Sequence, residues 1–407
     1  MTAALALTPS LAFSAASHPL SAASATVERH ASLCVRQLRL TDFRSYERLR
    51  LELTAQPVVL AGPNGAGKTN LLEAVSLLAP GRGLRRAKLD EFARRAPGQA
   101  PGQGAASWGV AATLDCASGP LAIGTGLEPA ASRRAVRIDG SPATSQTALA
   151  EHVAAVWLTP QLDRLFMEGA GNRRRFLDRM VAGFDPAHAG RAAAYDNALR
   201  QRNRLLAEGS TDQTWLAALE DTMARYGVAL SIARSDLVAR LDQASRLGVG
   251  PFPRGALALH GTLEQWTAAL AAVDAEEKLR NALADSRRAD AESGGAAFGP
   301  HRGDLAVQHL DRGRMAGECS TGEQKALLVA IVLAHARLVT LARGAPPLLL
   351  LDEIAAHLDR EKLRALFEEL CALGAQAWLS GTDAETFAPL AGRAQFFRVA
   401  DGAVATH

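Results

Sequence analysis

Two hydrophobic patterns follow each other along this chain and predict a sheet-forming core that is interrupted by helices. Apolar and polar residues alternate over residues 35–40 and 49–53, which is typical of half-exposed strands. Unbroken apolar runs, typical of strands buried on both faces of a parallel sheet, occupy residues 57–61, 153–158, 347–351 and 377–379. Further strand candidates predict an antiparallel meander, at residues 107–115, 120–127 and 134–139.

From about residue 172 to 245 the pattern changes to helical spacing. Large apolar residues form one face of a long helix, and we expect this face, its aromatic residues included, to lie in the core. These residues are Trp215, Leu219, Met223, Tyr226, Leu230, Leu237 and Leu241. A further helix is predicted near residues 274–290, and α/β character returns over residues 299–407.

These patterns predict an α/β protein: a mixed sheet with flanking helices and an antiparallel meander, split by an inserted helical lobe. The predicted divisions are residues 33–165, a helical lobe over 166–295, and 296–407. Residues 1–32 are rich in Ala and Ser and lack the basic start of a secretory signal. We expect them to be a disordered extension or the result of a misassigned start codon. Residues 96–105 are predicted to form a flexible loop.

A phosphate-binding loop is the most specific motif. Residues 62–69 read Gly-Pro-Asn-Gly-Ala-Gly-Lys-Thr between a predicted strand and a predicted helix, which matches G-x-x-x-x-G-K-[ST]. Its backbone N–H groups and the helix N-terminus attract phosphate oxygens, while Lys68 is predicted to reach the β- and γ-phosphates and Thr69 to hold Mg²⁺. The predicted nucleotide-binding residues are Gly62, Pro63, Asn64, Gly65, Ala66, Gly67, Lys68 and Thr69. A chance glycine turn is disfavoured by the strand–loop–helix context.

A second constellation ends the apolar run 347–351 with two carboxylates, Asp352 and Glu353. The carboxyl end of a parallel strand is where an α/β sheet binds ligands. Asp352 is predicted to hold Mg²⁺, and Glu353 to polarise a water for attack on the γ-phosphate. Alone, such carboxylates would only mark a strand end; together with the phosphate-binding loop they favour a nucleotide hydrolysis site.

A capped helix start lies between these motifs. Ser320 is a candidate N-cap and Glu323 stands three residues later, which is a capping box. The run from Ser320 through Gly322 to Gln324 resembles the signature motif of ABC ATPases. That resemblance implies that Ser320 and Gly322 contact the ATP held by a second subunit, so that ATP joins two heads.

Three weaker features agree with the ABC resemblance in order and spacing. Asp359 follows the carboxylates as a D-loop residue would, and Gln161 follows a strand as a Q-loop residue would, although a plain loop glutamine is nearly as good an interpretation. Thr382 stands where transporter-type members carry a histidine, which favours a repair or SMC-like head.

Composition bounds these interpretations only loosely. The chain has 407 residues, 48% of them hydrophobic, and we recognise no apolar stretch long enough to span a bilayer. The net charge of +3 is too small to indicate nucleic-acid binding by itself. The cysteines lack metal-ligand spacing and fit reduced thiols of a cytoplasmic protein, at Cys34, Cys116, Cys319 and Cys371.

From about residue 33 onward the chain resembles the RecF family of SMC/ABC-type ATPases. Besides the phosphate-binding loop, the resemblance rests on residues 38–46, 173–178, 202–206 and 299–305. It implies a slow, switch-like, DNA-stimulated ATPase that forms an ATP-dependent homodimer and binds gapped DNA or single-strand/double-strand junctions. It also implies work with RecR and RecO in loading RecA, in recombinational repair, replication restart and the SOS response, without a membrane partner.

Basic residues offer candidate DNA contacts. Arg173, Arg174, Arg175 and Arg179 cluster at the start of a predicted helix. A patch that follows DNA phosphates and a solvated helix face with internal ion pairs are about equally good interpretations. The group Arg82, Arg85, Arg86 and Lys88 could contact nucleotide or DNA phosphates. His301 and Arg302 suit either nucleotide sensing or a structural turn, and Phe43 with Arg44 suits either a base contact or the core.

The predicted mechanism is a clamp: two ATP-bound heads close on duplex DNA, and hydrolysis opens them. A transporter ATPase subunit, an ATP-gated scaffold that does not hydrolyse ATP, and a P-loop kinase are the alternatives. Thr382 disfavours the first, and the helix at Ser320 disfavours the kinase. The sequence does not separate slow hydrolysis from none.

Overall fold

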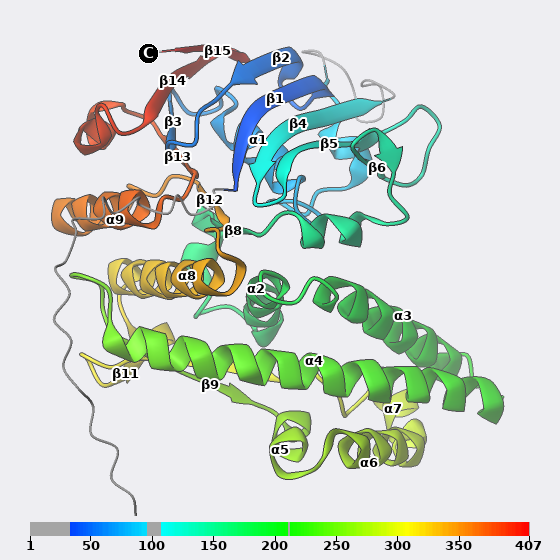
Figure 1. Cartoon of the computed structure of the whole chain (residues 1–407). Helices are drawn as coiled ribbons and strands as arrows, with labels where there is room; N and C mark the ends of the chain where they lie inside the picture. Colours follow the sequence, from blue (N-terminus) through cyan, green and yellow to red (C-terminus); the bar gives the residue numbers. More distant parts are fainter. Residues whose placement is uncertain (1–32, 96–106, 211, 407) are drawn as a thin grey trace, which may run out of the picture. The chain divides into compact units, whose positions relative to one another are not determined.

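The computed structural model describes residues 33–95, 107–210 and 212–406, all of which belong to one compact unit (Figure 1). The predicted extension 1–32 and the predicted loop 96–105 lie outside the described residues. Within the described part, two six-stranded sheets, a small three-stranded sheet and a set of helices account for the architecture.

The central sheet is assembled from both ends of the chain. Its order is β15-β14-β3-β13-β12-β8, with only β14 and β15 antiparallel. The strands are β3 (Val58–Ala61), β8 (Ala155–Leu158), β12 (Leu348–Leu351), β13 (Ala377–Gly381), β14 (Gln395–Ala400) and β15 (Ala403–Thr406). Every residue of β3, β8, β12 and β13 is buried, as the apolar runs predict.

The predicted meander is confirmed as part of an antiparallel sheet of order β2-β1-β4-β5-β6-β7. Its strands are β1 (Cys34–Phe43), β2 (Tyr46–Glu52), β4 (Trp108–Cys116), β5 (Gly119–Leu127), β6 (Ala135–Ile138) and β7 (Ser141–Pro142). One hydrophobic cluster joins it to α1 (Lys68–Ser76) and the central sheet. The buried Gln376 reinforces the junction, because its side chain accepts a hydrogen bond from Val35 N and donates to the carbonyls of Val35 and Thr54.

The helical region is confirmed, with one addition. It comprises α2 (Ala170–Ala182), α3 (His188–Ala207), α4 (Gln213–Leu247), α5 (Thr262–Ala269), α6 (Ala272–Asp285) and α7 (Arg287–Ser293). The sequence patterns did not predict β9 (Gly255–His260), which pairs antiparallel with β10 (Asp304–His309) and thereby joins residues on both sides of the predicted 295/296 division. The short β11 (Arg314–Met315) completes this sheet.

One expectation about the α4 face is wrong. Leu219, Met223 and Leu241 are buried as predicted, but the side chain of Trp215 is 50% exposed. Trp215 lies in the first turn of α4, where the helix has just begun at its N-cap Asp212. Helical spacing places a residue on a face but does not show how far along the helix the covering partner extends.

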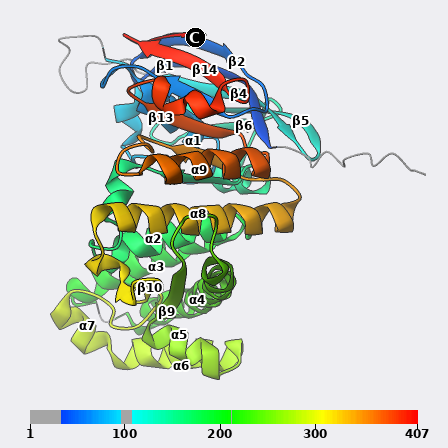
Figure 2. The same cartoon turned by 90° about the vertical axis from the view of Figure 1, so that its left-hand side faces the viewer.

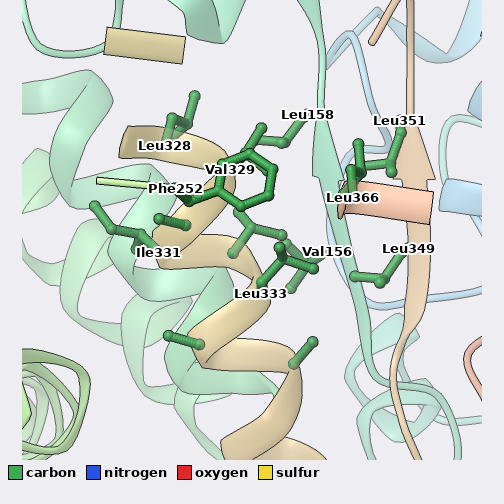
Figure 3. Packing of buried hydrophobic residues seen from close by; sticks show 14 of the residues in the cluster. Val156, Leu158, Phe252, Leu328, Val329, Ile331, Leu333, Leu349, Leu351 and Leu366 are labelled. Carbon is green, nitrogen blue, oxygen red and sulfur yellow. The ribbon is translucent and has the colours of Figure 1, made fainter. Parts of the chain in front are cut away.

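The mostly buried helix α8 (Thr321–Arg343) lies between the central sheet and α4 (Figure 1, Figure 2). The helix α9 (Arg360–Leu373) packs beside α8 and buries one face. Leu328, Ile331 and Leu333 of α8 belong to the same hydrophobic cluster as residues of β8 and β12 (Figure 3). Short 3-10 helices complete the described fold, at Leu89–Phe92 (η1), Gln146–Glu151 (η2), Pro160–Arg164 (η3), Ala316–Glu318 (η4) and Glu385–Leu390 (η5).

The expectation that no apolar stretch could span a bilayer needs correction. By length and composition alone α8 is apolar enough to cross a membrane. However, 72% of its most apolar window is buried inside the protein, and the core helix of a soluble protein passes the same test. In the sequence the charged residues Lys325 and Arg337 interrupt this run, which hides its total length.

The packing of β12 gives the first testable prediction. Leu350 is fully buried, so Leu350→Ala should lower the free energy of unfolding by about 2–5 kcal/mol through lost burial and a residual cavity. The matched control is Leu341→Ala on α8, whose side chain is 84% exposed and whose loss should change stability by less than about 0.5 kcal/mol. Urea denaturation followed by circular dichroism measures both. Equal effects of the two substitutions would contradict the buried position of β12.

Candidate functional site

The loop between β3 and α1 requires glycine at two positions. Gly67 is the N-cap of α1 and has a φ of 111°, in the left-handed region. A Cβ on Gly67 would lie 2.7 Å from the hydroxyl of Tyr46, which donates a hydrogen bond to the Gly67 carbonyl at 3.1 Å. A Cβ on Gly62 would lie 2.0 Å from the carbonyl oxygen of Val399. The loop is therefore fitted to its surroundings, while residues 63–65 at its tip are exposed and Ala66 is buried.

Lys68 lies folded against this loop. Its Nζ donates to the carbonyl oxygens of Gly62 at 2.6 Å and Pro63 at 2.8 Å. Burial lowers the pKa of Lys68, while the nearby carboxylates of Glu353 and Asp352 act in the opposite direction. The ammonium group is thus positioned at the loop and held by acceptors that an incoming phosphate could replace.

The structure brings the two predicted metal-binding residues together across the sheet. The Thr69 hydroxyl donates to the carboxylate of Asp352, with distances of 3.0 and 3.1 Å to its two oxygens. Ser380, on β13, donates to the same carboxylate at 2.6 Å and accepts the backbone N–H of Glu353 at 2.9 Å. The polar end of this strand is visible in the sequence, but the role of Ser380 was not predicted from it.

These oxygens fit the chemistry of Mg²⁺. A hydroxyl and one buried carboxylate are a small ligand set, and Mg²⁺ commonly takes one or two carboxylates with waters and phosphate oxygens completing its shell. The described residues contain no cluster of three or more His, Cys, Asp or Glu side chains that would hold a metal by themselves. The site therefore suits a metal that arrives with a phosphate ligand.

Glu353 occupies a strained position directly after β12. Its φ of 48° lies in the left-handed region, which is uncommon for a residue with a Cβ. The buried Lys325 of α8 donates to the Glu353 carbonyl at 3.3 Å and forms an ion pair with Asp163 of η3, also at 3.3 Å. Burial raises the pKa of Asp163, and the charge of Lys325 opposes that shift. Lys325 thereby links α8 to η3 and to the residue that follows β12. In the sequence it stands out only as a charged residue next to an apolar run.

The capping box at the start of α8 is confirmed. Ser320 is the N-cap: its hydroxyl accepts the backbone N–H of Glu323, and the Glu323 carboxylate accepts the N–H of Ser320 at 3.0 Å. Ser320 itself is exposed. Gly322 faces the carbonyl of His357, which a Cβ would approach to 3.5 Å. Asp359 is likewise an N-cap, of α9, and accepts from Lys362 N at 2.8 Å.

Gln161 and Thr382 are exposed and follow β8 and β13. Because these strands run parallel to β12, both residues lie at the same edge of the sheet as Asp352. Their predicted contacts with nucleotide stay predictions.

The structure separates the four arginines of the predicted DNA patch. Arg173 forms an ion pair with Asp304 at 2.7 Å, and Arg174 donates to the Gly303 carbonyl at 2.7 Å. Arg179 is half-buried with its guanidinium 4.0 Å from the ring centre of Trp157, and only Arg175 is exposed. Arg173 and Arg174 therefore anchor α2 to β10 and to the loop before it. The four arginines do not form one continuous surface patch.

The aromatic residue considered as a base contact lies in the core. Phe43 is fully buried and stacks on Phe92 with ring centres 5.8 Å apart. Its neighbour Arg44 forms an ion pair with the buried Glu73 at 2.7 Å. The core alternative for Phe43 is confirmed and the base contact is wrong, because neither face of its ring reaches solvent.

His301 takes part in a structural turn. Its Nε2 donates to the carbonyl of Ala296 at 2.9 Å, so its Nδ1 accepts from the Tyr195 hydroxyl at 2.7 Å. Burial lowers the pKa of His301 to about 4, against the hydrogen bond to Ala296. Arg302 donates to the same carbonyl at 2.9 Å. The imidazole is therefore neutral near pH 7 and does not present a charge to a phosphate.

Comparisons with known proteins agree with this geometry. A family model described as the RecF/RecN/SMC N terminal domain matches residues 34–400. The "DNA replication and repair protein RecF" of Rhizobium etli (strain CIAT 652) is 48% identical over 374 residues, which cover 90% of this chain and 97% of that protein. Among solved structures, the recombination mediator protein RecF in the RecFOR pathway has a TM-score of 0.79 at 21% identity, covering 93% of this chain and 100% of that one. An SMC head bound to the C-terminal winged-helix domain of ScpA has a TM-score of 0.51 at 16% identity, covering 92% and 96%.

The neutral His301 predicts a pH effect on stability. The unfolded chain takes up a proton near pH 6.5, but the folded chain does so only near pH 4, so the unfolded state binds more protons in between. The contribution of His301 is therefore fully present above pH 6.5 and is lost as the pH falls toward 4, by at most about 1.4 kcal/mol per pH unit.

His301→Gln should flatten the pH dependence of the free energy of unfolding between pH 6.5 and 4.5, measured by urea denaturation. The control is His260→Gln, because His260 is exposed. Equal slopes for the wild type and His301→Gln would show that His301 is charged in the folded protein.

Proposed function

Because the chain belongs to the RecF family, we propose that it is an ATP-dependent DNA-binding protein of replication and repair. The observation that carries this proposal is the contact between Thr69 and Asp352 beside the phosphate-binding loop. A hydroxyl and a carboxylate of the kind that hold Mg²⁺ in an ATPase thus lie within hydrogen-bond distance, although they come from opposite ends of the chain. The family relatives at 48% identity are named for DNA replication and repair, which supports the role of the site.

In this proposal the phosphate-binding loop and the strand ends divide the nucleotide contacts between them. The backbone of residues 62–67 surrounds the phosphates, and Lys68 donates to them in place of the Gly62 and Pro63 carbonyls. Thr69 and Asp352 hold Mg²⁺, which neutralises phosphate charge when bound. Glu353 orients or deprotonates the attacking water, with Gln161 helping to position it. The half-buried place of Glu353 beside Lys68 supports this assignment.

We further propose that ATP joins two copies of the chain. Ser320 and Gly322 lie at the exposed start of α8, a 23-residue helix whose N-terminus favours an anion. They would contact the nucleotide of the second copy, together with Asp359, while Thr382 contacts the nucleotide of its own copy. A groove of about 790 Å³ lies beside this helix start, with Gly322 and Asp359 among its lining residues.

The closed pair would clamp duplex DNA at gaps or single-strand/double-strand junctions, and slow hydrolysis would open it. In the cytoplasm it would work with RecR and RecO to load RecA in recombinational repair, replication restart and the SOS response. The pathway named for the solved RecF relative supports RecR and RecO as partners. A transporter subunit is disfavoured by Thr382 and by the names of the relatives.

Two substitutions test the nucleotide site. Lys68→Ala should abolish ATP binding, and Glu353→Gln should keep binding but slow hydrolysis by about a hundredfold or more, the size of a general-base contribution. Fluorescent-nucleotide titration and phosphate release measure the two effects. The control for charge is Glu292→Gln, an exposed position of α7. If the Glu353→Gln protein stays monomeric in excess ATP, the proposed ATP-dependent clamp is wrong.

A matched pair of substitutions tests Ser320. Asp and Asn both replace Ser well as N-caps, but only Asn can also donate to the Glu323 carboxylate as the Ser320 hydroxyl does, so urea denaturation first checks that the Ser320→Asp and Ser320→Asn proteins are equally folded. Only the aspartate places a negative charge where the second copy's γ-phosphate is expected. In sedimentation velocity with ATP and Mg²⁺, the Asn variant should dimerise and the Asp variant should stay monomeric while still binding ATP. Dimerisation of both would remove Ser320 from the interface.

A further inference from the structure

Four arginines that have no carboxylate partner among the described residues surround a single pocket. It has a volume of about 370 Å³, and its lining comes mainly from the loop after α1, the strand β8 and the helices α2 and α3. The arginines are Arg82, Arg86, Arg175 and Arg179. By contrast, Arg85 and Arg173 in the same segments form ion pairs, with Glu73 and Asp304. The pocket therefore gathers positive charge that the protein leaves uncompensated.

Arg179 is the least exposed member of this arginine pocket. Its guanidinium lies over Trp157, and its Nη1 donates only a long hydrogen bond, of 3.4 Å, to the Trp157 carbonyl. Burial lowers the pKa of Arg179 to about 9, and the charges of Arg86 and Arg175 act in the same direction. Most of the N–H donors of this half-buried guanidinium are therefore available to solvent or to an anion.

At the rim of the arginine pocket, Arg86 and Arg175 likewise lie close to other positive charges. Desolvation and the charges of Arg175 and Arg82 lower the pKa of Arg86, while the charge of Asp196 acts in the opposite direction. Arg86 also has a φ of 57°, in the left-handed region. The loop thus holds Arg86 in an unfavourable backbone conformation close to like charges. Arg175 has one described acceptor, the side-chain oxygen of Asn172.

The acidic residues that line the pocket do not neutralise it. Asp178 is engaged by Arg234, at 2.7 and 2.8 Å, and by His188 at 2.8 Å. Asp196 is exposed and forms no ion pair within the described part of the chain, although its charge opposes the pKa shift of Arg86. Only one carboxylate is therefore left against four guanidinium groups.

This arginine pocket is separate from the nucleotide site. The phosphate-binding loop precedes α1, whereas Arg82 and Arg86 follow it. A helix of nine residues separates the two ends by about 13 Å. The pocket also includes Ala154 and Ala155, at the amino end of β8, while Asp352 follows the carboxyl end of the neighbouring strand. The arginines of this pocket therefore lie away from the phosphate-binding loop.

We propose that the arginine pocket binds a phosphate group of a DNA strand, which rests on the proposed DNA-binding function. Guanidinium groups match phosphate oxygens with paired N–H donors, and several at one point suit a group that carries more than one oxygen. Small residues leave room for it, among them Gly81, Gly83, Ala189 and Ala193. A phosphate there contacts both the segment that follows α1 and the helices α2 and α3.

The experiment compares two double variants that each remove two positive charges. Arg86→Ala with Arg175→Ala alters the pocket rim. Arg204→Ala with Arg288→Ala is the matched control, because both residues are exposed and lie in helical pairs with Glu208 and Glu292. Fluorescence anisotropy with a labelled gapped duplex, over a series of salt concentrations, gives DNA affinity, and a fluorescent ATP analogue gives nucleotide affinity.

The pocket variant should bind DNA about tenfold or more weakly, and the slope of its salt dependence should fall by about one unit for each phosphate that it no longer binds. Its ATP affinity should match the wild type, and the control should bind DNA within about twofold of it. Duplexes with a 5′-phosphate or a 5′-hydroxyl at the gap distinguish a terminal phosphate from an internal one. Equal DNA affinity of the pocket variant and the control overturns the proposal.

A second measurement separates this proposal from the proposed function. Trp157 contacts Arg179, so filling the pocket should change its fluorescence. Pyrophosphate is titrated into Lys68→Ala protein, whose phosphate-binding loop is disabled, and Trp157→Phe identifies the responding tryptophan. If wild-type protein binds no DNA, the proposed function fails. A Trp157-dependent response would then assign the pocket to a free phosphate compound and overturn the DNA source, whereas no response would overturn the pocket as a phosphate site altogether.

Discussion

The parallel pairing of β3 with two strands from the far end of the chain is the constraint on which the site depends. β3 lies between β13 and β14, and β12 lies next to β13, so the loop after β3 and the carboxylate after β12 open at one edge of the sheet. The contact of Thr69 with Asp352 spans 283 positions of the sequence. No short stretch of sequence holds these groups together; the parallel pairing of the strands places them at one edge of the sheet.

Around this edge, buried polar contacts connect the segments that must act together. Ser380 fixes the Asp352 carboxylate and also accepts the backbone N–H of Glu353, so the carboxylate of one residue and the backbone of the next share one anchor. Lys325 connects the start of α8 to the Glu353 carbonyl and to Asp163. Removing one partner of such a buried pair leaves an uncompensated charge, so a displacement of α8 is costly unless the strand end follows it. This gives a physical route between the helix proposed to face the second copy and the proposed site of hydrolysis.

The sequence predicted those parts of the fold that are encoded locally. The apolar runs, the phosphate-binding loop and the capping box of Ser320 depend on neighbours within a few residues, and the structure has all of them. The sequence patterns did not predict β9, because this short strand depends on pairing with β10, which is distant in the sequence. Ser380 and Lys325 were missed for the same reason, since their partners are distant in sequence. Trp215 shows a different kind of error: the predicted helix is correct, but this residue of its apolar face is exposed.

The arginines show most clearly why a run of like residues is ambiguous until its partners are known. Arg173 and Arg179 are six residues apart on one helix, yet Arg173 faces Asp304 while Arg179 faces Trp157 and other arginines. The first is neutralised within the protein and the second is not, so only the second retains free capacity for an anion. Since α1 carries the phosphate-binding loop at its start and leads into the arginine pocket at its end, a phosphate at either end bears on the same helix.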